Sequence, residues 1–123
     1  MSNTRIVVAD DSDMILSLVV LALQREGYEP ATATNGADAL ARIREVRPQL
    51  VILDALMPNG DGYDVCRAVR DDPDLERPYV IMLTAGARES DRERAEVAGV
   101  DEFITKPFSP AELRARVREI LGS

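Results

Sequence analysis

Residues 50–54 of the chain read LVILD, a run of large apolar residues that ends in a carboxylate. A strand that is apolar on both faces is typical of the centre of a parallel sheet, because helices cover both faces of such a sheet. We therefore expect a buried central strand at 50–54, with the rest of the fold built around it.

Similar apolar runs predict further strands, and the amphipathic segments between them predict helices. The strands are expected at residues 5–9, 29–33, 79–84 and 101–105, and the helices at 12–26, 35–46, 61–71, 90–98 and 109–121. Strands that alternate with helices are typical of an α/β fold with a parallel sheet. We predict a single domain over residues 1–123 with five strands and five helices.

The overall composition argues against several classes of protein. The 123 residues are 46% hydrophobic and 30% charged, the balance of a globular domain. A net charge of −7 argues against a nucleic-acid-binding surface. The most apolar helical segment, residues 14–24, is too short to cross a membrane. No signal peptide is recognisable, so we expect a cytoplasmic protein without membrane insertion. The single cysteine, Cys66, excludes an internal disulfide framework and is expected to pack in the core.

Polar side chains follow the predicted strands where each strand ends. Because ligand sites of parallel α/β sheets gather at the carboxyl ends of the strands, we expect these side chains to converge at one edge. The set comprises Asp10, Asp11, Asp54, Thr84 and Lys106.

The charges of this set predict a metal site. Three carboxylates placed together repel one another and raise each other's pKa values. Mg²⁺ prefers oxygen ligands and would offset two of the three negative charges. The third would be offset by Lys106, the only lysine in a chain that otherwise uses fourteen arginines.

A neutralised site of this kind is suited to phosphoryl transfer, which needs a nucleophilic oxygen and cations to stabilise the phosphoryl oxygens. Asp54 is the candidate nucleophile, because carboxylates form aspartyl phosphates. Lys106 and Thr84 would each hold a phosphoryl oxygen. Since the chain has no histidine, a phosphohistidine donor would have to come from another protein.

Four segments carry a resemblance to a known family. They read VVADDSD (7–13), VILDALMPNGDGYDV (51–65), VIMLTAGA (80–87) and FITKPF (103–108). Together, at these spacings, the chain resembles the receiver domain of bacterial two-component response regulators. The resemblance covers essentially the whole chain. It implies a doubly wound, flavodoxin-like (CheY-like) α/β fold with the strand order 2-1-3-4-5, and a sensor histidine kinase or phosphotransfer protein as partner.

The resemblance also implies roles for the acidic residues. Asp54 corresponds to the phosphoacceptor and to a metal ligand. Asp11 would bind Mg²⁺ directly, and Asp10 would bind it directly or through water. The main-chain carbonyl of Leu56 would complete the protein's share of ligands. In this family the domain catalyses only its own phosphorylation and dephosphorylation.

Further residues correspond to the switch of the family. Thr84 and Lys106 would bind the phosphoryl group, and the Lys106–Pro107 peptide bond is expected to be cis. Phosphorylation would draw Thr84 inward, and Phe103 would fill the space that it leaves. The surface formed by residues 90–121 would change shape as a result. An ordinary core role for Phe103 is the alternative.

Residues 14–24 have more apolar side chains than one buried stripe requires. The stripe is expected to comprise Ile15, Leu18, Val19, Ala22 and Leu23, and the surplus Met14, Leu16, Val20 and Leu21. We predict a face for a partner, or for self-association, centred on Leu16 and Val20. Simple tolerance of exposed apolar groups is the alternative.

Other functions of a similar fold fit less well. A flavodoxin-like cofactor binder needs a donor-rich loop after the first strand, where this chain has the acidic DDSD. A Mg²⁺-dependent phosphatase of the haloacid dehalogenase type requires Asp-x-Asp, but Leu56 follows Asp54 and Ala55. A receiver-like interaction module that never turns over phosphate usually lacks an acid or the lysine, and this chain has them all.

Overall fold

The fold is built on a five-stranded parallel sheet, here in a computed structural model that describes residues 4–85, 93, 96 and 98–122. The strand order is β2-β1-β3-β4-β5, as the family resemblance implies. The strands are β1 (Ile6–Ala9), β2 (Ala31–Ala33), β3 (Leu50–Asp54), β4 (Tyr79–Thr84) and β5 (Glu102–Thr105). The predicted central strand is confirmed, since β3 lies between β1 and β4 and is buried along its whole length.

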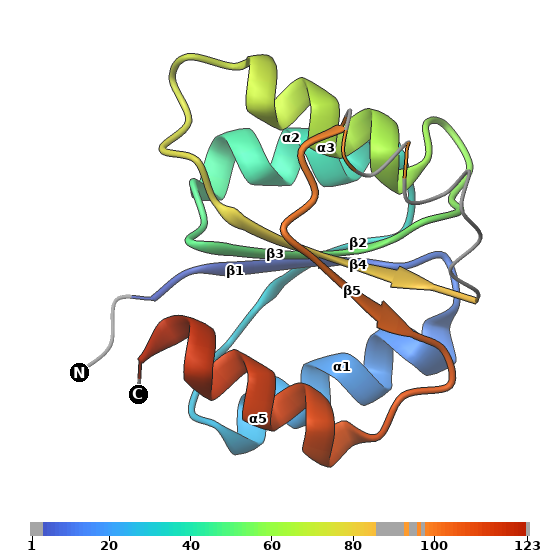
Figure 1. The fold of residues 1–123 in the computed structure, drawn as a ribbon, viewed down its shortest axis with the longest axis vertical. Coiled ribbons are helices and arrows are strands. Elements are labelled where there is room, and N and C mark those ends of the chain that lie inside the picture. Colours follow the sequence, from blue (N-terminus) through green and yellow to red (C-terminus); the bar gives the residue numbers. More distant parts are fainter. Residues whose placement is uncertain (1–3, 86–92, 94–95, 97, 123) are drawn as a thin grey trace.

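Helices cover both faces of this sheet (Figure 1). On one face lie α2 (Gly36–Val46) and α3 (Gly62–Asp71), and on the other α1 (Asp13–Arg25) and α5 (Pro110–Leu121). Among the residues that the structure describes, no helix is long and apolar enough to span a bilayer.

The alternation of side chains along each strand divides the core into two clusters. In β3, Val51 and Leu53 pack with α2 and α3, whereas Leu50 and Ile52 pack with α1 and α5. Because successive side chains of a strand point to opposite faces, a strand that is apolar at every position serves both clusters. Cys66 is fully buried in the first cluster, as predicted, and burial raises the pKa of its thiol to about 11.

Most predicted elements agree with the structure to within a few residues. The second strand begins at Ala31 and not at residue 29, and Pro30 explains the difference because proline has no N–H to donate to the sheet. The predicted helix over 90–98 lies largely outside the described residues, so the described part of the chain shows four of the five predicted helices.

The buried stripe of α1 differs from the predicted one at two positions. Leu18 was expected in the core but is 41% exposed. Leu16 was expected to be surplus but is half-buried and packs on the cluster that α1 shares with α5. The exposed apolar side chains of α1 are therefore Met14, Leu18 and Leu21. Val20 is half-buried.

Candidate functional site

The predicted polar residues meet at the carboxyl edge of the sheet. β1 and β3 are parallel neighbours with Ala9 beside Leu53, so Asp10 follows β1 next to the end of β3, where Asp54 lies. On the next strand Thr84 ends β4 and is buried. The main chain of Lys106 donates to the carbonyl of Thr84 at 2.7 Å. Three adjacent strands and the segment after β5 thus bring these groups together.

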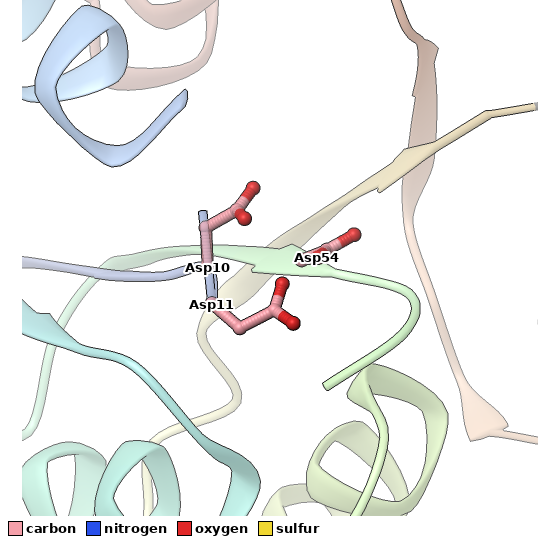
Figure 2. A group of neighbouring side chains, drawn as sticks. All are labelled: Asp10, Asp11 and Asp54. Carbon is pink, nitrogen blue, oxygen red and sulfur yellow. The ribbon is translucent and has the colours of Figure 1, made fainter. Parts of the chain in front are cut away.

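Three carboxylates lie at the centre of this edge. One oxygen from each of Asp10, Asp11 and Asp54 lies within 4.8 Å of the others. Figure 2 shows the side chains of Asp10 and Asp11 at the end of β1 and that of Asp54 at the end of β3, all directed to the same side. Asp10 is fully buried, Asp54 is 7% exposed, and Asp11 is exposed. The cluster is therefore anchored inside the protein and open to solvent at Asp11.

The ammonium group of Lys106 joins two of the carboxylates. Its Nζ donates to Asp10 Oδ2 at 3.1 Å and to Asp54 Oδ1 at 3.0 Å. The Lys106–Pro107 peptide bond is cis. One point charge thus serves two carboxylates, which leaves the cluster with a net negative charge.

The acidity of Asp54 reflects its burial first and the charges around it second. Burial raises the pKa of Asp54 to about 6 from an ordinary value of 3.8. The Lys106 hydrogen bond lowers this pKa, and the charge of Asp10 raises it further. Burial works against the charge of Lys106 as well, but its hydrogen bonds to Asp54 and Asp10 prevail and raise its pKa. The folded chain alone does not fully compensate the charge at Asp54.

The donor atoms suit a hard divalent cation. The cluster offers carboxylate oxygens only, which are the ligands that Mg²⁺ and Ca²⁺ prefer. A charge of +2 added to three carboxylates and one ammonium group makes the site neutral. The arrangement is a cluster of acidic residues that is able to hold a metal ion.

Sequence reasoning missed two supporting groups. The main-chain N–H of Ser12 donates to Asp10 Oδ1 at 2.8 Å, so both oxygens of Asp10 accept a bond. Gly62, the first residue of α3, lies against Asp54, because a Cβ there would be 2.3 Å from the Asp54 carbonyl oxygen. A glycine directly after the helix cap Asp61 is the sequence signal that could have indicated this contact.

Phe103 and Leu56 lie at the margins of the site. Phe103 is half-buried and packs on the cluster beneath α2 and α3. The side chain of Leu56 is 70% exposed. The roles that the resemblance gave to these residues, and the switch role of Thr84, stay predictions.

Comparison with known proteins identifies the family. Residues 6–118 match the family model described as "Response regulator receiver domain". The PhoP regulatory protein of alkaline phosphatase synthesis from Bacillus subtilis is 40% identical over 119 residues, which are 97% of this chain and 49% of the relative. The phosphate regulon regulator PhoB of Rhizobium meliloti is 40% identical over 117 residues, 95% of this chain and 52% of the relative. The chain thus spans about half the length of these curated relatives.

Solved structures agree with this result. The chemotaxis response regulator CheY4 of Vibrio cholerae has a TM-score of 0.89 at 28% identity, over 97% of this chain and 99% of that one. The BeF3-activated DrrB receiver domain has a TM-score of 0.85 at 32% identity, over 98% of both chains. The chain belongs to the receiver domain family of two-component response regulators.

Proposed function

We propose that Asp54 accepts a phosphoryl group and that this modification switches the signalling state of the domain. The observation that carries the proposal is the position of Asp54, a nearly buried carboxylate at the end of the central strand with an ammonium group 3.0 Å away. Its neighbours are two further carboxylates. Membership of the receiver family supports the same assignment.

The phosphoryl donor is a phosphohistidine on a sensor histidine kinase or phosphotransfer protein. A carboxylate oxygen of Asp54 attacks the phosphorus, and the P–O bond forms as the P–N bond to the donor imidazole breaks. The imidazole nitrogen keeps the electron pair and takes a proton from solvent. The product is an acyl phosphate on Asp54. Lys106 is placed to pair with a phosphoryl oxygen, because its ammonium group already contacts the attacking carboxylate.

Asp10, Asp11, Asp54 and the main-chain carbonyl of Leu56 are the groups that would hold Mg²⁺. When bound, the cation supplies positive charge to the acidic cluster and to the phosphoryl oxygens during transfer. The all-oxygen donor set and the charge count of the cluster support this choice.

The conformational response is assigned to Thr84 and Phe103. Thr84 is buried at the end of β4, where its hydroxyl can turn toward a phosphoryl group on the neighbouring strand. Phe103 is half-buried on β5, which lies beside β4. Movement of Thr84 on β4 therefore changes the space that is available to the Phe103 side chain. The cytoplasmic location remains a prediction.

Phosphorylation is tested with a small-molecule donor. The protein is incubated with acetyl phosphate and MgCl₂, and the added phosphate is detected by intact mass spectrometry. We expect one phosphate on the wild type and none on Asp54→Asn. Asp74→Asn, which changes an exposed carboxylate elsewhere on the chain, is the matched control. Equal labelling of Asp54→Asn and the wild type would refute the assignment, and an unlabelled wild type would favour an interaction module without phosphate turnover.

We propose that the donor protein docks on α1. The centre of this face moves from the predicted Leu16 and Val20, which are half-buried, to the exposed Leu18 and Leu21. A groove of about 160 Å³ between α1 and α5 is lined by Leu18 and Leu21, with Arg25 and Arg114 among its other residues. Met14, at the end of α1 near the acidic site, is exposed as well. Arg114 is paired with Glu26 at 2.9 Å, so the charge offered to a partner is that of Arg25. An apolar groove beside this arginine suits an apolar helix with acidic neighbours on the kinase or phosphotransfer protein.

This surface is tested by separating the two kinds of donor. Leu18→Glu should slow phosphotransfer from a partner kinase and leave labelling by acetyl phosphate unchanged. Ser17→Glu adds the same charge at the adjacent exposed position and should have the smaller effect on transfer. If Leu18→Glu slows both reactions equally, or slows neither, the surface is wrongly placed.

A further inference from the structure

The loop between β3 and α3, residues 55–61, carries the proposed metal ligand Leu56. Its base is fixed by two main-chain hydrogen bonds, from Ala55 N to Leu83 O at 2.9 Å and from Gly62 N to Ala55 O at 3.0 Å. Leu56 itself has a long main-chain hydrogen bond, from its N–H to Asp54 Oδ1 at 3.5 Å, and its side chain is largely exposed. The position of its carbonyl therefore depends on how the rest of the loop is held.

The far part of this loop rests against the first residue of α2. Gly36 N donates to Pro58 O at 3.0 Å. A Cβ on Gly36 would lie 2.0 Å from Gly60 O and 2.8 Å from Asn59 O. Asn59 and Gly60 both have positive φ angles, 57° and 105°, so the loop turns sharply at the point of contact. Gly36 is helical, and the close approach, not its backbone angles, is the reason for glycine here.

We infer that Gly36 is a positioning residue for the cation: by letting the loop pack directly on α2, it fixes the loop that presents the Leu56 carbonyl to the acidic cluster. The inference rests on the proposed Mg²⁺ site. A side chain at residue 36 would have to move the Gly60 carbonyl by about 1 Å to reach a contact distance that real Cβ atoms show. Mg²⁺ demands near-ideal octahedral geometry at about 2.0–2.1 Å, so it tolerates such a displacement of one ligand poorly.

The inference is tested on Gly36→Ala by titration with MgCl₂, followed by the amide resonances of the acidic edge in NMR spectra. We expect Mg²⁺ affinity to fall about tenfold or more, the range measured when groups that orient metal ligands are removed. Labelling by acetyl phosphate should slow at low Mg²⁺ and return to the wild-type rate at saturating Mg²⁺. A purely structural role for Gly36 would lower thermal stability without moving the Mg²⁺ midpoint.

Ala37→Gly is the matched control. Residue 37 is exposed on the same turn of α2, so this change weakens the helix without placing an atom against the loop. Its melting temperature should fall and its Mg²⁺ affinity should stay at the wild-type value. The inference is overturned if Gly36→Ala binds Mg²⁺ with an affinity within about twofold of the wild-type value. It is overturned as well if Ala37→Gly loses as much affinity as Gly36→Ala.

Should Gly36→Ala fail to fold, the wild-type protein provides the measurement. The amide resonance of Gly36, which reports its bond to Pro58, should shift during the titration with the same midpoint as that of Leu56. The amide of Gly27, at the opposite end of α1, should stay in place. A Gly36 resonance that does not move while that of Leu56 does overturns the inference alone. A wild-type protein without any response to Mg²⁺ overturns the proposed metal site, and the inference with it.

Discussion

Two regions of the molecule pair carboxylates with a single basic side chain, and the carboxylate pKa shifts in opposite directions. One is the acidic site, and the other is the charged network of Tyr79, Glu102 and Arg116 between β4, β5 and α5. In the network, Arg116 donates to both oxygens of Glu102, and the Tyr79 hydroxyl donates to Glu102 at 2.8 Å. These bonds, the Arg116 one first, outweigh burial and lower the pKa of Glu102. At the acidic site Lys106 is shared between Asp10 and Asp54, and the pKa of Asp54 rises.

The opposite pKa shifts indicate different roles for the two contacts. The Glu102–Arg116 contact is structural, whereas the acidic site around Asp54 is suited to binding a ligand. Glu102 accepts from a planar guanidinium that matches its two oxygens. Among the residues that the structure describes, it shares Arg116 with Glu119, which lies at the surface. Asp54 is more deeply buried, and its cation is divided between two acids. In the network the guanidinium and the Tyr79 hydroxyl outweigh burial at Glu102. At the acidic site burial and the charge of Asp10 outweigh Lys106, so Asp54 keeps an uncompensated negative charge that a cation from solution can offset.

Separate replacement of Lys106 and of Arg116 should show the largest difference in stability between the two regions. Lys106→Met leaves the fully buried Asp10 and the nearly buried Asp54 without a cation, and we expect a loss of about 3 kcal/mol in unfolding free energy without Mg²⁺. Arg116→Met should cost less, because Glu102 keeps the Tyr79 hydroxyl. Urea denaturation in EDTA gives both values. The comparison fails if the two variants lose equal stability.

Addition of metal should stabilise the protein through the acidic site alone. At a Mg²⁺ concentration ten times the dissociation constant, binding to the folded state adds about 1.4 kcal/mol to the unfolding free energy. Asp11→Asn should lose most of this gain, whereas Glu102→Gln should keep it. Thermal melts with MgCl₂ and with EDTA measure the effect. A gain of the same size in Asp11→Asn would contradict the site.

Removal of one excess negative charge should stabilise the protein when no metal is present. Asp54→Asn removes the cost of burying a charge at this position and also the repulsion with Asp10. It should raise the unfolding free energy in EDTA by about 1 kcal/mol. With saturating Mg²⁺ the wild type should recover the difference. Denaturant titrations in the two buffers check this, and a variant less stable than the wild type in EDTA would show that the acids are already compensated.

The network should show the smallest effect, and this effect should disappear in acid. The pKa of Glu102 is lowered in the folded state from an ordinary value of 4.5, so its stabilising effect is present above that value and is lost as the pH falls through the folded pKa. Glu102→Gln should therefore melt about 2 °C below the wild type at neutral pH. This gap should close in acid. Melting curves from pH 7 to pH 3 test this, and a gap that widens in acid would contradict the sign.

The sequence predicted the sheet and the meeting of the acids well, for physical reasons. Apolar runs such as 50–54 identify buried strands, and the rule that ligand sites lie at the carboxyl ends of parallel strands places Asp10, Asp11 and Asp54 together. The strand order came from the family resemblance, because local pattern says nothing about which strands pair.

What the sequence did not predict depends on contacts between distant elements. Leu16 is half-buried and Leu18 is exposed, the reverse of the prediction, because α5 packs beside α1. A helical pattern cannot show where a neighbouring helix lies. The close contacts of Gly36 and Gly62 join segments that only the folded chain brings together. The sharing of Lys106 between Asp10 and Asp54 likewise depends on three separate strand ends.

The burial of Cys66 has a practical consequence for spectroscopy. Its thiol is enclosed and held protonated, with a pKa of about 11, and only the thiolate reacts readily with maleimides and iodoacetamides. A cysteine introduced at an exposed position of the native protein would therefore carry a dye or spin label selectively. Paired with a second such position, it would allow distances across the domain to be followed without first replacing the natural thiol.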